Sequence, residues 1–303
     1  MNLAPGAAHA PSREARQAGA LGASLPALLV AARRVAITVA QGVHGRRRVG
    51  QGDSFWQFRP FLPGDPVSRI DWRQSAKSDR VFVRETEWEA AQTVCLWADA
   101  SPSMRWCSQL ARTDKAERAR LLLLALAALL LRGGERVRVL APGETSHGGR
   151  DALEALARAL TGTDSDGPDA SLPPELPVPR HATAVLFGDF LVPLDRVRAA
   201  LAGLAAVPAA VHVLQVLDPA ERALPFQGRV RFTDLEDAGE ALIPRVEGVR
   251  GAYAERFARH EEGLAQVCRD LGFRFATHLT DQPPEAALLA LYVALAPQGE
   301  ALR

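Results

Sequence analysis

Carboxylates and hydroxyls follow several apolar segments of the chain at the point where each segment ends. The most regular case is Asp99, Ser101 and Ser103, spaced as D-x-S-x-S directly after the apolar run TVCLWA. A turn that leaves a strand can aim alternate side chains at one point, and such oxygen ligands suit Mg²⁺. Asp189 follows a second apolar run, AVLFG. These four residues are the candidate metal ligands.

A structural interpretation of the same motif competes with the metal interpretation. Asp and Ser side chains commonly cap turns and bond backbone amides, and D-x-S alone is typical of such turns. The position of Asp99 at the end of an apolar strand, with Asp189 expected nearby, favours a ligand site instead. Both interpretations stay open on the sequence.

The segments around these residues alternate between strand and helix. Asp114 and Glu117 form a D-x-x-E capping box before one apolar helix, which Gly133 can close. The remaining boundaries follow from apolar periodicity, Gly and Pro. Strands are expected at 81–99, 136–140, 182–188, 209–217 and 273–279, a hairpin turning near 236–239, and helices at 26–41, 115–132, 151–160, 194–205, 249–270 and 284–296. This order predicts an α/β fold with a doubly wound, mainly parallel sheet.

A doubly wound sheet binds its ligand at the carboxyl ends of its strands. The polar residues that directly follow the expected strands are Asp99, Ser101 and Ser103, then Glu144, Thr145 and His147, then Asp189, Asp218, Thr280 and Asp281. We expect these side chains to gather on one edge of the sheet.

Composition narrows the class of protein. The chain has 303 residues, 48% of them hydrophobic, and a formal net charge of +1, which gives no general basic field for nucleic acid. Three cysteines without a CxxC pair indicate a reducing, cytoplasmic location. The apolar run 121–131 is too short to span a membrane, and Arg33 and Arg34 interrupt the segment 25–40. Peripheral association with the inner membrane through helix 26–41 stays open.

The motifs of common enzymes are not found in the sequence. It contains no G-x-S-x-G elbow or S-x-x-K pair around its serines, no P-loop or G-x-G-x-x-G after a strand, and no H-E-x-x-H. We therefore expect no catalytic residue and no enzymatic activity.

The segment before the first core strand is rich in Arg, Asp and aromatic residues. It reads GRRRVGQGDSFWQFRPFLPGDPVSRIDWRQSAKSDRVFVRETEWE and resembles the signature of the bacterial domain-of-unknown-function 58 family. The string DASPSM at 99–104 resembles the metal-ion-dependent adhesion site of von Willebrand factor A domains. The residues that match the family pattern are Arg59, Phe61, Pro63, Gly64, Asp65, Arg69, Ile70, Asp71, Trp72, Ser75, Ala76, Val83, Arg84 and Glu85.

The resemblance implies a von Willebrand factor A-like domain. Members commonly accompany MoxR-type AAA+ ATPases in systems thought to assist folding, metal insertion or assembly of other proteins. It also implies a Mg²⁺ site made by Asp99, Ser101, Ser103 and Asp189, and a MoxR-type ATPase or its client as partner. One departure concerns the threonine of the adhesion site, for which this sequence offers only Thr145, with neighbours that do not match.

The Arg- and Trp-rich segment itself has two interpretations. Its opposite charges can pair with one another, and Arg can stack on Trp or Phe, so the residues 53–89 are expected to be pinned to the core domain without folding alone. Exposed Trp and Arg also dominate protein interfaces. The candidate partner-binding residues are Arg59, Asp65, Arg69, Asp71, Trp72 and Arg84.

The expected organisation is a disordered N-terminus at 1–24, a helix with the Arg- and Trp-rich irregular segment at 25–92, and a von Willebrand factor A-like domain at 93–298. Three functions follow. The first is a non-enzymatic binding module or adaptor, the second a metal-assisted phosphohydrolase using Asp99 and Asp189, and the third a metal-free scaffold. A missing general base makes the second weaker than the first.

Overall fold

The computed structural model describes most of the chain, namely residues 27–40, 55–62, 65, 67, 70–77, 80–86, 92–149, 151–161, 170–207, 209–235 and 239–295. It divides into two compact units. Residues 42–91 form the smaller unit, and the helix at 27–40 groups with the chain from residue 92 onward. The expected grouping of 25–92 into one N-terminal part therefore differs from the structure, because the helix belongs with the larger unit.

The larger unit is an α/β domain whose central sheet has five strands, all parallel. This confirms the predicted fold class. The strands are β3 (Thr93–Ala98), β4 (Arg136–Val139), β5 (Thr183–Gly188), β6 (Ala210–Leu217) and β9 (Arg274–Leu279). Their spatial order is β4-β3-β5-β6-β9. The chain moves outward from β3 to β4 and then returns to the other side of β3, so the order reverses between β3 and β5.

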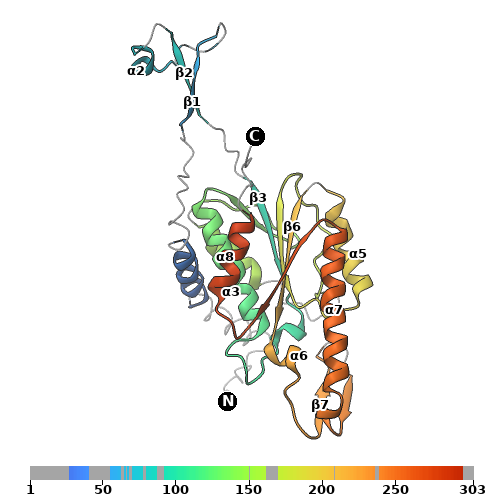
Figure 1. The fold of residues 1–303 in the computed structure, drawn as a ribbon. Coiled ribbons are helices and arrows are strands. Elements are labelled where there is room, and N and C mark those ends of the chain that lie inside the picture. Colours follow the sequence, from blue (N-terminus) through green and yellow to red (C-terminus); the bar gives the residue numbers. More distant parts are fainter. Residues whose placement is uncertain are drawn as a thin grey trace, which may run out of the picture. The chain divides into compact units, whose positions relative to one another are not determined.

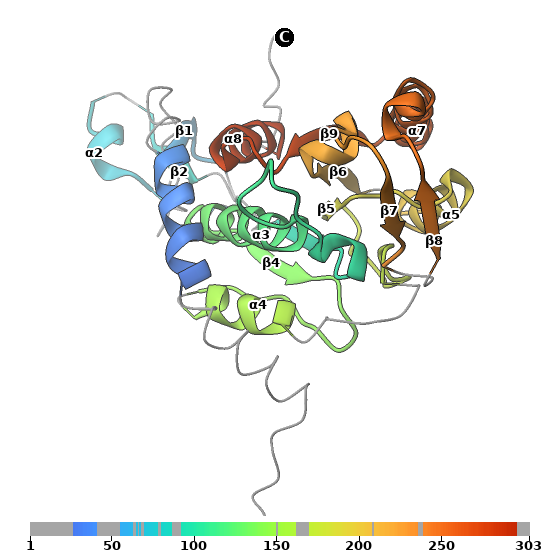
Figure 2. The same ribbon diagram turned by 90° about the horizontal axis from the view of Figure 1, so that it is seen from below.

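Helices cover both faces of this sheet (Figures 1 and 2). On one face α3 (Lys115–Arg132) packs over the strands and against α8 (Pro284–Leu295). On the other face α5 (Leu194–Ala205) packs with α7 (Arg250–Asp270), while α4 (Ala152–Thr161) lies by the edge strand β4 and also contacts α3. Such a doubly wound arrangement leaves the strand ends as the exposed edges of the sheet.

The expected boundaries of α3 are confirmed to the residue, and its sequence explains them. The carboxylate of Asp114 accepts a hydrogen bond from the backbone N–H of Glu117 at 2.7 Å, which satisfies one of the free donors of the first turn. The run from Leu122 to Leu130 is buried throughout. Burial of these apolar side chains against the sheet and the neighbouring helices removes them from water, which stabilises the helix.

The helix at 27–40 confirms the segment expected at 26–41. Its buried residues are Ala32, Val35, Ala36 and Val39. Arg33 and Ile37 line a small cleft together with Arg132 at the end of α3. Among the described residues, no helix combines the length and the apolar character needed to cross a bilayer.

The smaller unit contains regular structure that the sequence analysis did not expect. Strand β1 (Phe55–Pro60) pairs antiparallel with β2 (Phe82–Thr86), and a short helix, α2 (Trp72–Ser75), lies between them in the chain. The expectation of an irregular segment is therefore wrong there. The continuous strand expected at 81–99 is also wrong, because β2 and β3 belong to different units. A strand of six residues beside Pro and Gly carries too little periodicity to be recognised.

A second antiparallel hairpin follows β6. Strands β7 (Val230–Thr233) and β8 (Glu240–Ile243) confirm the hairpin that was expected to turn near residues 236–239. Between β6 and this hairpin lies α6 (Pro219–Ala223), and the 3₁₀ turns η2 (Pro102–Arg105) and η3 (Val246–Gly248) complete the unit. Helix α6 was not predicted.

Candidate functional site

The site is built where strand order reverses, at the carboxyl ends of β3 and β5. All four central residues of β3 are buried, and the backbone N–H of Asp99 donates to the carbonyl of Phe187 on β5 at 2.8 Å. The Asp99 side chain caps the turn that follows the strand, because its Oδ1 accepts the N–H of Ser101 at 2.8 Å. Crossovers leave the sheet in opposite directions at this point, which opens the crevice where doubly wound folds bind ligands.

The two serines and Asp189 come together as the sequence predicts. Pro102 begins η2, and this tight turn carries Ser103 back toward Ser101, so that their hydroxyl oxygens lie 3.1 Å apart. The Ser103 hydroxyl donates to Oδ2 of Asp189 at 3.0 Å. The hydrogen-bonded chain therefore joins the motif after β3 to the acid after β5, which are 86 residues apart in sequence.

The turn after β5 is held in an unusual conformation. Phe190 has a φ of 51°, in the left-handed region that costs free energy for a residue with a side chain. Its ring is fully buried 6.1 Å from the ring of Trp97, and its carbonyl accepts from Nε2 of His260 at 2.8 Å. These contacts fix the direction in which Asp189 leaves the strand.

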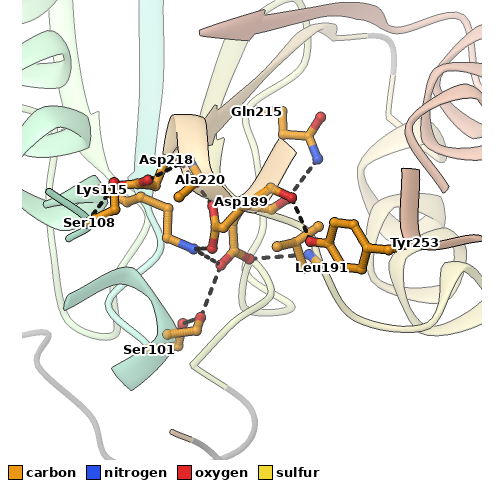
Figure 3. A network of polar contacts seen from close by, with 11 residues as sticks. Ser101, Ser108, Lys115, Asp189, Leu191, Gln215, Asp218, Ala220 and Tyr253 are labelled. Atoms are coloured by element: carbon orange, nitrogen blue, oxygen red, sulfur yellow. Dashed lines mark hydrogen bonds and ion pairs between the residues drawn. The ribbon is translucent and has the colours of Figure 1, made fainter. Parts of the chain in front are cut away.

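A lysine that sequence analysis did not select completes the site (Figure 3). Lys115, the first residue of α3, is 1% exposed, and its ammonium donates to Oδ2 of Asp189 at 2.8 Å. The same ammonium donates to Glu221 in α6, whose backbone carbonyl accepts the hydroxyl of Tyr253. The backbone of Asp189 is held as well, because Gln215 donates to its carbonyl at 2.9 Å.

The acidic groups of the site have opposite pKa shifts. Burial raises the pKa of Asp99 to about 7, and the nearby Asp189 carboxylate adds to this effect. Burial alone would also raise the pKa of Asp189, but the Lys115 ammonium and the N–H and O–H donors around it hold that pKa below its usual value. Asp189 is therefore a carboxylate at neutral pH, whereas Asp99 is partly protonated.

Other strand-end residues serve the structure. Asp218 accepts the N–H of Ala220 and the N–H of Ser108, and its own N–H donates to Glu221, which completes a capping box at α6. Glu144 and His147 pair with each other at 3.3 Å on the loop after β4. Thr280 is buried, and its Oγ1 has no hydrogen-bond partner among the described residues. Only Asp218 joins the site network, through Glu221.

The candidate partner-binding residues of the smaller unit divide into several groups. Asp65 accepts the N–H of Leu62 at 2.9 Å, and Asp71 caps α2 by accepting the N–H of Gln74 at 2.8 Å, so both hold local structure. Trp72 is 65% exposed. Arg59 lies in β1 and Arg84 in β2, with side chains outside the described part, as is the whole of Arg69.

The residues do not fit a Mg²⁺ ion shared by Asp99 and Asp189. One observation favours a cation, since Oδ2 of Asp99 is buried without a hydrogen-bond partner. However, Oδ2 of Asp189 is already taken by Lys115 and Ser103, and its Oδ1 accepts the N–H of Leu191 at 3.1 Å. An ion shared by the two acids would need an available oxygen on each of them, whereas both oxygens of Asp189 already accept hydrogen bonds. Thr145 is exposed on the loop after β4.

In the part of the chain that the structure describes, no group of three or more His, Cys, Asp or Glu side chains is placed to hold a metal ion.

Two signals in the sequence could have revealed the missed residues. The chain has 36 Lys and Arg residues, of which only Lys77 and Lys115 are lysines, so a lysine is unusual here. The string D-P-A-E at 218–221 carries the D-x-x-E spacing of a capping box, with Pro at the first helical position. No sequence pattern, however, links Lys115 to Asp189 or Glu221, which are 74 and 106 residues away.

Comparison with known proteins identifies relatives across most of the chain. The uncharacterized proteins Rv1480 of Mycobacterium tuberculosis and Mb1516 of Mycobacterium bovis are each 27% identical over 279 residues, which cover 85% of this chain and 86% of the relative.

Two solved structures also align with the chain. One is an aerotolerance-related membrane protein from Bacteroides fragilis, with 15% identity and a TM-score of 0.37 over 67% of this chain and 98% of the other. The second is BatB, a conserved hypothetical protein from Bacteroides thetaiotaomicron, with 16% identity and a TM-score of 0.37 over 68% of this chain and 99% of the other.

The family comparison covers more than half of the chain. The model of the family described as "Protein of unknown function DUF58" matches residues 57–263, a range that includes most of β1 and the whole site from Asp99 to Glu221. The chain therefore belongs to the DUF58 family.

Proposed function

We propose that this protein is a non-enzymatic protein-binding module of von Willebrand factor A type, and that the carboxyl edge of its sheet is the binding face. The observation that carries the proposal is the position of the Asp99–Ser101–Ser103–Asp189 network at the reversal of strand order. In doubly wound folds this position is where ligands bind.

Apolar side chains beside the network support a protein as the ligand. Leu110, on the loop after η2, is 53% exposed, and Leu191, two residues after Asp189, is 39% exposed. Trp106 is half-buried between η2 and that loop. Aromatic side chains such as Trp are enriched in protein interfaces, whose buried core is more apolar than the rest of the surface. The family resemblance makes a MoxR-type AAA+ ATPase, or the client of such an ATPase, the proposed partner.

The hydrogen bonding of the serines supports a binding role over a hydrolytic one. The hydroxyls of Ser101 and Ser103 bond to each other and to Asp189, whose low pKa makes it a weak base. One observation favours the alternative of a phosphohydrolase, because Asp99 has the raised pKa that is common among catalytic acids. Assays with phosphoesters distinguish the two, and we expect no turnover above that of an Asp99→Asn variant.

The binding face can be tested with the purified full chain and the MoxR-type ATPase of the source organism. We expect Leu110→Asp and Leu191→Asp to weaken binding at least tenfold, because each places a charge in an apolar contact. The matched control is Val293→Asp on α8. Val293 is 58% exposed, at least as much as either leucine, but it lies in a helix on the face of the sheet. Calorimetry or interferometry measures the Kd.

The same experiment identifies the alternative docking surface. Trp72 in the smaller unit is exposed and has the residue type that dominates interfaces. Binding that survives both Leu variants but is lost in Trp72→Ala would move the binding face to residues 42–91. The proposal for the carboxyl edge would then be abandoned.

A further inference from the structure

The carboxyl edge contains a cation that belongs to the chain itself. Three carboxylic acids meet there, Asp99, Asp189 and Glu221, and the first two are 2% exposed. A buried carboxylate is tolerated only with an opposite charge, a proton or several hydrogen-bond donors. Lys115 supplies the charge, because its ammonium bonds to Asp189 and to Glu221 and is itself buried.

The position of this ammonium is the informative feature. Oδ2 of Asp189 receives both the Lys115 ammonium, at 2.8 Å, and the Ser103 hydroxyl, at 3.0 Å. Ser103 in turn bonds to Ser101. The ammonium therefore lies where the D-x-S-x-S serines converge on the second acid, which is the region that a bridging metal ion would have to share.

We propose that Lys115 is the resident cation of this site, and that it holds the carboxyl edge together in place of a divalent metal ion. The donor set supports this, because the ammonium and Ser103 together with the Leu191 N–H use both oxygens of Asp189. The site is then complete in the isolated chain. Neither its assembly nor its stability depends on free Mg²⁺.

The choice of amino acid fits this role. The chain uses Arg in 34 of its 36 basic positions, since it has only two lysines, yet the buried position beside Asp189 is a lysine. An ammonium is a compact charge that can donate in three directions, whereas a guanidinium is a broad planar fork. The compact group suits a buried position where one nitrogen bonds to both Asp189 and Glu221.

The first test compares the thermal unfolding of purified full-length variants in Mg²⁺ and in EDTA. We expect the wild-type Tm to be the same in both. Lys115→Met keeps the length of the side chain but removes the charge, so it should lower Tm by on the order of 10 °C. The matched control is Lys77→Met, at the exposed second lysine, which should leave Tm unchanged.

The variant that lacks the ammonium gives a direct test of metal substitution. In Lys115→Met, the carboxylates of Asp189 and Glu221 lose their cation, and Mg²⁺ should then raise Tm. Adding Asp189→Asn removes one of the uncompensated charges, so the double variant should recover part of the lost Tm and should no longer respond to Mg²⁺. The double variant also keeps the test valid if Lys115→Met fails to fold.

A spectroscopic readout follows from the rarity of lysine. Selective labelling of lysine side chains gives only two ε-methylene signals, from Lys77 and Lys115. We expect the Lys115 signal to stay in place when Mg²⁺ is added, because the metal has no position beside it.

Three results would overturn the proposal. A wild-type Tm that rises by several degrees in Mg²⁺, with the rise lost in Asp99→Asn, would show a metal site. A Lys115→Met variant as stable as wild type would show that the ammonium is dispensable. A double variant no more stable than Lys115→Met would show that Asp189 is not the group that the ammonium neutralises.

The inference concerns the same site as the proposed function, and the two can fail separately. All of these measurements use the isolated chain, so they do not depend on a partner. Loss of the proposed binding face would leave the role of Lys115 intact, whereas a metal response of the wild type would leave the binding face intact.

Discussion

At the scale of single residues, folding raises the pKa of Asp99 into the neutral range, where the change in its protonation can be measured. Its folded pKa of about 7 lies above the usual value of 3.8, so the folded state holds a proton that the unfolded state releases between about pH 4 and pH 7. Its contribution to stability is therefore greatest at low pH and falls as pH rises through this window.

Replacement of Asp99 by Asn tests this sign. Asn keeps the acceptor for the Ser101 N–H but cannot ionise. The stability of the variant should therefore not fall at this position as pH rises, whereas that of the wild type should. We expect the free energy of unfolding of Asp99→Asn, relative to wild type, to increase by about 2 to 4 kcal/mol between pH 4 and pH 8. Denaturant titrations at several pH values measure it, and parallel profiles for the two proteins would contradict the assignment.

Gly188 is required by the close approach of Asp99. A Cβ added at Gly188 would lie 3.1 Å from the Asp99 Cβ and 3.3 Å from both its Oδ2 and the Trp97 ring. We expect Gly188→Ala to lower the free energy of unfolding by about 1 to 3 kcal/mol, because the neighbours must shift within a packed interior.

The control for this variant is Gly203→Ala in α5. A Cβ there meets no atom within 4 Å, and Ala is favoured over Gly in a helix by up to about 1 kcal/mol. Unchanged or increased stability is expected. Equal effects of the two substitutions in thermal unfolding would show that crowding at Asp99 is not the cause.

At the scale of elements, the capping residues of α3 and α6 have different structural roles. Asp114 caps α3 alone, whereas Asp218 caps α6 and also accepts the N–H of Ser108 from the loop after η2. The second cap is fully buried and ties two loops of the carboxyl edge together. Loss of Asp218 leaves the buried N–H of Ala220 and the half-buried N–H of Ser108 without this partner.

The expected result is a clear ranking of the two Ala variants. Asp114→Ala should cost about 1 kcal/mol, which is typical of a helix cap, and Asp218→Ala about 2 to 3 kcal/mol. Hydrogen exchange should show faster exchange at Ser108 only in Asp218→Ala. Similar losses in the two variants, with no change at Ser108, would mean that the link between the loops contributes nothing.

Elements with local signals could be predicted, and those without could not. Helix α3 begins at a D-x-x-E box and ends before Gly133. Strand β5 contains the apolar run AVLFG, and β6 is apolar except at His212 and Gln215, so the boundaries of these elements follow from the chain nearby. Strand β1 and the five-residue helix α6 depend on pairing or on a cap that few residues encode. Long elements with a regular apolar pattern can be recognised in the sequence, whereas short elements such as β1 and α6 cannot.

In the site, the residues that follow strands could be predicted from the sequence, whereas Lys115 could not. Asp99, Ser101, Ser103 and Asp189 follow strands, and the rule that parallel strands share a carboxyl edge brings them together. Lys115 starts a helix and looks like a solvated charge in sequence, because nothing local shows that α6 and the turn after β5 will enclose it. Ion pairs across long sequence separations emerge only from the assembled fold.

At the scale of the whole molecule, two kinds of buried group give opposite pH dependences. Burial, with a smaller effect of Arg118, lowers the pKa of His278 to about 4, and burial with Arg274 does the same for His212. The unfolded state binds protons at these histidines below about pH 6.5, and the folded state does not. Stability is therefore lost on acidification from pH 6.5 to pH 4, whereas the Asp99 contribution is lost on raising pH.

These opposing dependences predict a stability maximum near pH 7 that single substitutions move in opposite directions. His278→Gln keeps an acceptor for the Arg118 guanidinium, 3.0 Å away in the wild type, but cannot bind a proton. The free energy of unfolding of the variant, relative to wild type, should be about 2 kcal/mol higher at pH 5 than at pH 8. The stability maximum should move to lower pH. Asp99→Asn should shift the maximum upward. Unfolding free energies from pH 4 to pH 8 measure both shifts, and a maximum that stays fixed in either variant would show that other groups set it.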